Sequence, residues 1–258
     1  NYANTYGGVV KDDDLKAVDA LVADLKRPTD KPWFKFVFLS SSHHSYQYPP
    51  EHEIFTPVET NPERFIFDKF MEPTPLVNKY KNSVHYVDAL FGQVWQTLAQ
   101  YQDANNTLSI VTGDHGEEFN DNGQGYWGHG NNFTKVQIAV PFLMQLPKLQ
   151  QKDDYPGVID RLSGHIDVVP TVLQQVAGCT NAISDYSVGS NLLQLPSERT
   201  GLISASYKDK AYLLGDTVYA TGLNVDSYSV FDLNKKNEAF DFAGLNKLKQ
   251  QESMLLKR

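Results

Sequence analysis

Cysteine, basic charge and long apolar runs are all scarce in this sequence of 258 residues. The single Cys179 excludes an intramolecular disulfide and a zinc–thiolate cluster, so any metal must be held by His, Asp or Glu side chains. One cysteine is compatible with the cytosol and with the periplasm. No apolar run approaches the roughly 18–20 residues of a membrane span, and residues 1–8 lack the basic-then-apolar order of a signal peptide. We therefore expect neither an anchor nor a signal peptide in this chain.

Positive charge is outnumbered by negative charge. The chain has 23 Lys and Arg against 31 Asp and Glu, a formal net charge of −8 and a pI near 5.3. Nucleic acid is not expected as a main partner, because that would require a broad basic surface. Apolar residues make up 41% of the chain, with 14 Tyr, 14 Phe and 3 Trp, which favours an ordered core. A single domain over residues 1–258 is the simplest prediction.

The spacing of apolar residues predicts an alternation of helices and strands. Amphipathic or capped helices are expected over 12–25, 76–98, 167–176 and 245–256. Short apolar or alternating runs predict strands over 34–39, 108–112, 140–146, 202–206, 211–214, 218–221 and 228–233. Residues 46–75 are rich in proline and show no period, which indicates a long surface excursion of the kind that often carries function.

This alternation predicts an α/β fold. We expect a mostly parallel sheet with helices on both faces, followed by a small antiparallel β addition near the C-terminus. In open α/β sheets, ligands bind at the carboxyl ends of the strands. The end of the strand over 108–112 is therefore the first place to search for a site.

That strand runs directly into an acid and an imidazole, Asp114 and His115, which lie between Gly113 and Gly116. Carboxylate oxygen and imidazole nitrogen are expected ligands for Zn²⁺ or Mn²⁺, and the glycines let the backbone turn tightly. Taken alone, the pair has a simpler interpretation, in which Asp114 caps a turn and His115 is incidental. An ordinary α/β binding domain without a metal is the corresponding function.

The context of this pair favours the metal interpretation. His129 follows fourteen residues later in a Trp-Gly-His-Gly segment, ahead of the strand over 140–146. The motifs that agree in order with these two are Ser42-His43-His44-Ser45-Tyr46, Tyr80–Asp88, Ser163–Thr171 and Asp185–Gly189. From about residue 31 to about residue 233, the ordered set resembles the alkaline phosphatase and sulfatase superfamily. The resemblance is greatest to its bacterial envelope branch of phosphoglycerol and phosphoethanolamine transferases and sulfatase-like inner-membrane proteins.

The resemblance implies hydrolysis or transfer of phosphate or sulfate esters with a divalent metal, which could be Zn, Mn, Mg or Ca. Asp114 and His115 would be metal ligands, and His129 and His44 would contact the ester group as catalytic and substrate-binding residues. For His44, a polar loop histidine is the competing interpretation. The expected partner is an anionic ester such as an envelope lipid head group. The expected location is the periplasmic or extracellular face of a bacterial inner membrane.

The sequence also departs from the family. No apolar strand ending in an acidic ligand, and no nucleophile segment, is found before Lys31. We therefore expect the later part of a catalytic domain, which meets a membrane only through a segment outside this chain. Alone, it would bind metal poorly and turn over little ester, because it has two of the usual three or four ligands. A non-catalytic lipid-binding or regulatory module of the inner membrane is the alternative function.

Several other polar residues have simpler interpretations. His85 is expected to pack within its helix, and His165 is expected to be structural, although it could line the site. Glu117, Glu118 and Lys135 are expected to be solvated.

Overall fold

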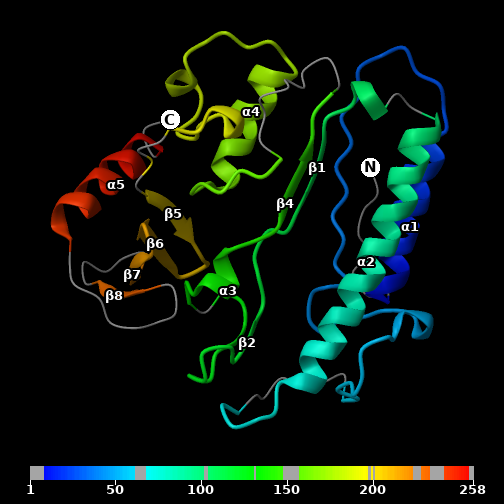
Figure 1. Ribbon diagram of the computed structural model, residues 1–258, viewed down its shortest axis with the longest axis horizontal. Helices are drawn as coiled ribbons and strands as arrows, with labels where there is room; N and C mark the ends of the chain where they lie inside the picture. The colour runs from blue at the N-terminus through cyan, green and yellow to red at the C-terminus, as the bar shows by residue number, and fades with distance from the viewer. Residues whose placement is uncertain are drawn as a thin grey trace. The chain divides into compact units, whose positions relative to one another are not determined.

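A computed structural model describes residues 9–61, 68–101, 104–130, 132–147, 157–196, 199, 201–222, 228–232 and 241–255 (Figure 1). The chain forms two compact units. The first unit comprises Asn1–Thr107 and Phe119–Gly128, and the second comprises Leu108–Glu118 and His129–Arg258. This division was not predicted from the sequence, because the chain crosses between the units in the middle of a short strand, β2 (Glu118–Phe119).

Two long helices form the core of the first unit, whose regular elements are α1 (Val10–Leu25), η1 (Pro50–His52), α2 (Thr74–Tyr101), η2 (Ala104–Asn106) and β3 (Trp127–Gly128). The two helices lie side by side (Figure 1). They run in the same direction, because Tyr86 Oη donates to the Lys11 carbonyl at 2.8 Å near one end, and Lys26 Nζ lies 5.7 Å from the Tyr101 ring centroid at the other. Both helices were predicted from apolar spacing, and both are confirmed.

The predicted strand over 34–39 is wrong. The segment has no regular secondary structure, and the side chain of Phe34 is 87% exposed and that of Phe36 77%. A continuous apolar run forms a buried strand only where other strands pair with it and other elements cover its faces. The described residues of the first unit contain no strand that pairs with this segment.

Buried polar side chains attach the loops of the first unit to its helices. Asp14 of α1 accepts hydrogen bonds from the backbone N–H groups of Ser40 and Ser41, at the start of the loop that carries His44. Asn82 of α2 is fully buried and accepts from two N–H groups, one of them Phe55, while its amide donates to the Phe55 carbonyl at 2.9 Å. The long excursion is therefore held in place by side chains of the helices.

The second unit contains β1 (Ser109–Thr112), α3 (Lys135–Ile138), β4 (Phe142–Gln145), η4 (His165–Asp167), α4 (Val168–Gln175), η5 (Ile183–Asp185), η6 (Leu192–Gln194), β5 (Gly201–Ala205), β6 (Asp209–Leu214), β7 (Thr217–Gly222), β8 (Ser229–Asp232) and α5 (Phe242–Leu255). The strands belong to small antiparallel sheets. β1 pairs with β4, and β5 to β8 form a four-stranded sheet in sequence order. A further short ribbon joins β2 to β3.

The predicted parallel sheet is therefore wrong. β1 and β4 were both predicted as strands, but they pair in opposite directions, with Ser109 opposite Gln145 and Thr112 opposite Phe142. Parallel neighbours need a crossover that returns the chain to the starting edge, usually through a helix of several turns. The connection between these strands contains the two-residue strands β2 and β3 and the four-residue helix α3, so it has no long crossover helix.

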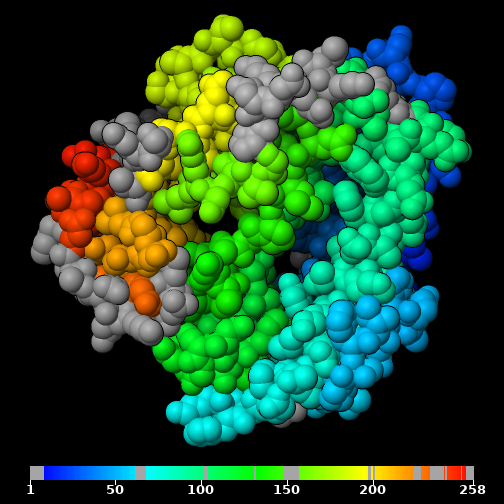
Figure 2. Space-filling model, in the orientation of Figure 1, coloured from blue at the N-terminus to red at the C-terminus, as the bar shows by residue number. Residues whose placement is uncertain are grey.

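The small antiparallel sheet expected near the C-terminus is confirmed. One of its faces presents Tyr212 and Tyr219, which pack against Leu245 and Leu248 of α5. The surfaces of the last strands and of α5, orange and red in Figure 2, meet directly. The opposite face contacts Phe133 and Ile138. The sheet is thus a platform for the segment that follows His129.

Replacing Asn82 with Ala tests whether the excursion depends on this side chain. The substitution removes the partner of two backbone N–H groups and one carbonyl in partly buried contacts, so we expect the free energy of unfolding to fall by about 2–4 kcal/mol in urea denaturation. Asn78→Ala is the matched control, because Asn78 donates a single side-chain hydrogen bond, to the Pro57 carbonyl, and about 1 kcal/mol is expected. Equal losses in the two variants would contradict the assignment.

Candidate metal and ester-binding site

The acid and imidazole predicted at the end of β1 lie close together. Asp114 has 61% of its side chain exposed, and its Oδ2 is 3.6 Å from Nε2 of His115. Two ligands at 2.0–2.1 Å from a tetrahedral zinc would lie about 3.3–3.4 Å apart. The separation of these two atoms is therefore close to what a shared cation requires.

The structure brings His129 onto His115. Their rings stack with centroids 3.8 Å apart and planes inclined by 24°. Both residues belong to the second unit, so this contact lies within one compact body. His115, Glu117 and His129 each offer a ligand atom within 4.8 Å of those of the other two. The cluster thus joins residues from two segments of the connection between β1 and β4.

Glu117 controls the protonation of His129. Only 6% of its side chain is exposed, and its Oε2 is 2.7 Å from Nδ1 of His129. This hydrogen bond raises the pKa of His129 above its ordinary value of 6.5, while partial burial acts in the opposite direction and the Glu117 and Asp114 charges reinforce the increase. Glu117 therefore favours an imidazolium at this position.

The hydrogen bonds also determine which ring nitrogen is left for a ligand. Nδ1 of His115 lies 2.9 Å from the Gly116 carbonyl, and a carbonyl only accepts, so this nitrogen carries the proton. Nδ1 of His129 donates to the Glu117 carboxylate in the same way. In both rings a metal or an ester would therefore be met through Nε2. Metal-binding histidines show this arrangement, in which the second nitrogen donates to a carbonyl or a carboxylate. The donor set therefore fits a divalent cation.

Glycines allow the backbone to reach these positions. A Cβ on Gly116 would lie 2.0 Å from the Val136 carbonyl oxygen, so the close approach of the two segments requires glycine. The Gly116 N–H donates across this contact to the Gln137 carbonyl at 2.8 Å. His129 lies between Gly128 and Gly130, which have φ angles of 76° and 72°. The reason for Gly116 is thus close packing, whereas the glycines beside His129 supply left-handed turns.

A buried carboxylate fixes the same two segments to each other. Glu118 is fully buried, and its Oε2 accepts hydrogen bonds from Asn132 Nδ2 at 2.9 Å, Thr134 Oγ1 at 3.0 Å and Gln137 Nε2 at 2.7 Å. All three donors follow His129 in the sequence. Glu118, which directly follows the segment containing His115 and Glu117, therefore holds the chain beyond His129 in place.

The prediction that Glu117 and Glu118 are solvated is wrong. Each is buried by donors that come from the segment after residue 128, and an isolated pair of acids gives no sign of such partners.

The other histidines lie in different surroundings. Nε2 of His165 is 3.3 Å from Oγ1 of Thr112, the last residue of β1, so this residue does adjoin the strand that leads to the site. His85 packs within the first unit against His52, with ring centroids 5.2 Å apart, as its helix position predicted. His44 belongs to the first unit, where its ring meets Tyr46 edge-on at 5.4 Å. Lys135 is exposed, as expected.

Comparison with known families identifies the fold and its relatives. The family model described as Sulfatase matches residues 2–178, which is more than half of the chain. The chain belongs to the sulfatase family. This family lies in the alkaline phosphatase superfamily, whose members hydrolyse or transfer esters and typically depend on a metal, so the predicted resemblance is confirmed.

Individual relatives agree with this assignment. The endo-4-O-sulfatase of Bacteroides thetaiotaomicron is 30% identical over 66% of this chain and 33% of its own length. The phosphoethanolamine transferase EptA of Salmonella typhimurium is 32% identical over 41% of this chain and 19% of its own length. This sulfatase-family chain therefore spans a third or less of the length of these curated relatives.

Solved structures show the same fold. An alkaline phosphatase superfamily protein from Vibrio parahaemolyticus superposes with a TM-score of 0.60 at 23% identity, covering 97% of this chain and 54% of that one. At this identity the likeness shows the fold alone. Among the described residues, no helix combines the length and apolarity needed to cross a membrane.

Substitutions at Glu118 test its structural role. In Glu118→Ala three buried donors lose their acceptor, so we expect the free energy of unfolding to fall by about 3 kcal/mol or more. Glu118→Gln keeps one acceptor oxygen and can place its amide nitrogen where Oε1 now lies, an atom without a hydrogen-bond partner among the described residues. A smaller loss is therefore expected for Gln in urea denaturation. Equal stability of Ala and wild type would contradict this role.

Replacing Glu117 with Gln tests the control of His129. The pKa of His129 should fall, because the charged hydrogen-bond partner is removed, and imidazole NMR signals in the presence of a chelator would report it. Folding raises this pKa, so the pair stabilises the protein fully below pH 6.5, and this stabilisation is lost as pH rises through the folded pKa. Glu51→Gln, at an exposed acid, is the control. An unchanged His129 pKa in Glu117→Gln would contradict the assignment.

Proposed function

We propose that this chain supplies metal-binding and ester-binding residues of a hydrolase or transferase that acts on phosphate or sulfate esters. The observation that carries the proposal is the convergence of Asp114, His115, Glu117 and His129 at the end of β1. With both imidazoles neutral, these side chains carry two negative charges, which match a divalent cation. The order of motifs and the sulfatase family support the same chemistry.

Asp114 and His115 are the proposed metal ligands. Oδ2 of the first and Nε2 of the second are within 3.6 Å of each other, and the His115 ring is oriented by its bond to Gly116. A divalent cation held there would neutralise charge on the ester oxygens and make the central atom more open to attack. Oxygen and nitrogen ligands together suit Zn²⁺ or Mn²⁺, and Mg²⁺ or Ca²⁺ would rely on the carboxylates.

His129 is the proposed ester-binding residue. Glu117 holds a proton on Nδ1 and raises the pKa of the ring, so that Nε2 can also carry a proton. An imidazolium in this position donates a hydrogen bond to an ester oxygen, or a proton to a leaving group, beside the cation. His44, in the first unit, is proposed as a catalytic and substrate-binding residue, as the family resemblance implies.

The finer parts of the proposal concern substrate and location. EptA is named as a phosphoethanolamine transferase, and the Bacteroides relative is named as an endo-4-O-sulfatase. The first favours an envelope lipid head group as substrate, and with it the periplasmic or extracellular face of an inner membrane. The second favours a sulfate ester on a sugar. We propose the lipid head group, because the whole ordered set of motifs resembles the envelope branch.

A specific contact favours the alternative function, a non-catalytic lipid-binding or regulatory module. Oε2 of Glu117 is engaged by Nδ1 of His129, so the proposed ligand assignment rests on Asp114 and His115. Catalytic zinc usually has three protein ligands. A site with two binds metal weakly and could serve recognition of an anionic head group without turnover.

Metal binding by calorimetry tests the ligand assignment. Asp114→Asn and His115→Ala should each weaken Zn²⁺ or Mn²⁺ binding about ten-fold or more, because each removes a ligand atom. Asp30→Asn, at an exposed acid of the first unit, is the control and should bind as the wild type does. Wild-type affinity in both site variants would contradict the metal site. Strong metal-dependent ester hydrolysis by the wild-type chain alone would contradict the expectation that this chain turns over little ester, and with it the non-catalytic alternative.

A further inference from the structure

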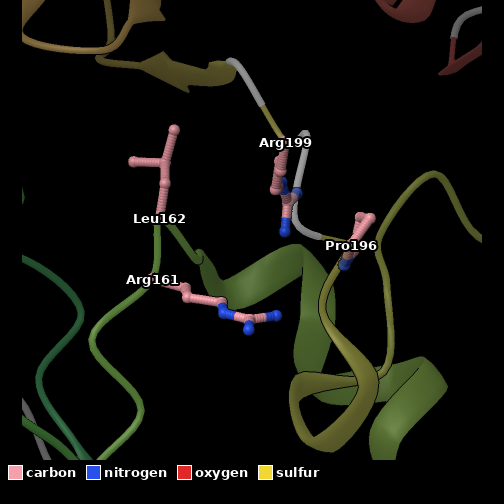
Figure 3. Close-up of a pocket in the computed structure, with 4 residues that line it drawn as sticks. All are labelled: Arg161, Leu162, Pro196 and Arg199. Atoms are coloured by element: carbon pink, nitrogen blue, oxygen red, sulfur yellow. The ribbon is translucent and has the colours of Figure 1, made fainter.

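A cavity of about 330 Å³ lies in the second unit. Its lining residues are distant in sequence from the metal cluster, by which we mean Asp114, His115, Glu117 and His129. It is lined by Arg161, Leu162, Pro196 and Arg199. Both guanidinium groups point toward the space between these residues (Figure 3). Two arginines that are well separated in the sequence therefore face the same cavity. Neither belongs to the metal cluster, so their presence there needs another explanation.

The position of Arg199 is fixed by a buried acid. Its Nη1 lies 2.6 Å from Oδ2 of Asp167, whose side chain is fully buried while that of Arg199 is 12% exposed. Asp167 also accepts from the Gly164 N–H at 2.8 Å and the Ser190 N–H at 2.7 Å. This carboxylate therefore has three donors, of which Arg199 is the one that carries a charge. The geometry of Arg199 is set before any ligand arrives.

Arg161 keeps its full charge. Its Nη1 donates to the carbonyl of Leu195 at 2.7 Å, and a carbonyl orients a guanidinium without neutralising it. Among the residues that the structure describes, no carboxylate forms an ion pair with Arg161. Arg161 and Arg199 together with Asp167 leave one net positive charge at the cavity, on a chain whose overall charge is −8.

We propose that this cavity binds a tetrahedral oxyanion, a sulfate or phosphate group carried by an organic ligand. Each guanidinium has five N–H donors in a planar fork, and each uses one of them in the contacts described above. The remaining donors of two converging forks suit the oxygens of sulfate or phosphate. The volume exceeds that of the bare ion, so the group that carries the anion also finds room beside Leu162 and Pro196.

The same loop adjoins the strand of the metal cluster. His165, four residues after Arg161, lies 3.3 Å from Thr112 at the end of β1, two residues before Asp114. On the proposed function, the cavity would hold a second anionic group of a substrate whose ester reaches the metal cluster, an extension that rests on that function. Oxyanion binding itself does not depend on that function, because it needs neither metal nor turnover.

Titration with sodium sulfate at constant ionic strength tests the proposal, with the arginine side-chain N–H signals followed by NMR in the presence of a chelator. Saturable shifts are expected in the wild type and in His115→Ala. In Arg161→Gln the affinity should fall about ten-fold, as expected for loss of a charge-assisted hydrogen bond. Arg161→Lys, which keeps the charge and loses the fork, should lie between the two. Arg27→Gln, at an arginine of the first unit, is the control and should titrate as the wild type does.

The same titration with phosphate and with glycerol phosphate distinguishes the sources of the oxyanion. Tighter binding of glycerol phosphate indicates a head-group phosphoester, and tighter binding of sulfate indicates a sulfated ligand; either result supports the site. Shifts that do not saturate, wild-type affinity in Arg161→Gln, or loss of saturable shifts in His115→Ala would each overturn it. The metal site is tested by loss of metal affinity in Asp114→Asn and His115→Ala, whereas the oxyanion site is tested by loss of oxyanion affinity in Arg161→Gln, so either proposal can fail without the other.

Discussion

The buried carboxylate of Glu118 is the contact on which the geometry of the metal cluster depends. It gathers three donors from the segment after His129, and it directly follows the segment that carries His115 and Glu117. A carboxylate removed from water is costly unless donors surround it, so this group is stable only when both segments occupy their native positions. The close approach at Gly116 strengthens the same constraint, since a larger residue would push the segments apart. Stacking of the two imidazoles follows from this packing.

The electrostatics of the cluster link protons and metal. Two stacked imidazoles with centroids 3.8 Å apart would repel each other if both were charged, and Glu117 supports the charge of His129 alone. A cation on Asp114 and His115 would disfavour the proton on His129 by the same repulsion. An anionic ester bound between them restores it, because the ester brings negative charge to Nε2. The cluster therefore suits a cation and an anionic ester bound together, because the cation offsets the two carboxylates and the ester offsets the charge on His129.

Features that depend on the local residue pattern were predicted from the sequence. Features that depend on residues far along the chain, such as strand pairing and the burial of acidic side chains, were not. The helices α1 and α2 and the C-terminal strands follow from apolar spacing, which each segment carries within itself. The antiparallel pairing of β1 and β4 goes with a connection that contains β2, β3 and the four-residue helix α3 but no long crossover helix, and the apolar spacing within the strands does not show this. Burial of Glu117 and Glu118 depends on donors beyond residue 128. The family was predicted correctly from the order of the motifs, although the sheet was not. Motif order indicates which residues occur together in a family, and it contains no information on strand direction.

The two proposed sites of the second unit have opposite charge, so they differ in whether an anion can bind without a metal. The cluster at the end of β1 carries two carboxylates, so an anionic ester approaches it favourably only after a cation has inverted its charge. The cavity with Arg161 and Arg199 is positive by itself and needs no such inversion. A chelator would therefore abolish ester binding at the first site and leave oxyanion binding at the second. A substrate with two anionic groups would be attached to the chain through the arginines before any metal arrived, and the metal would then determine whether its ester is held for reaction.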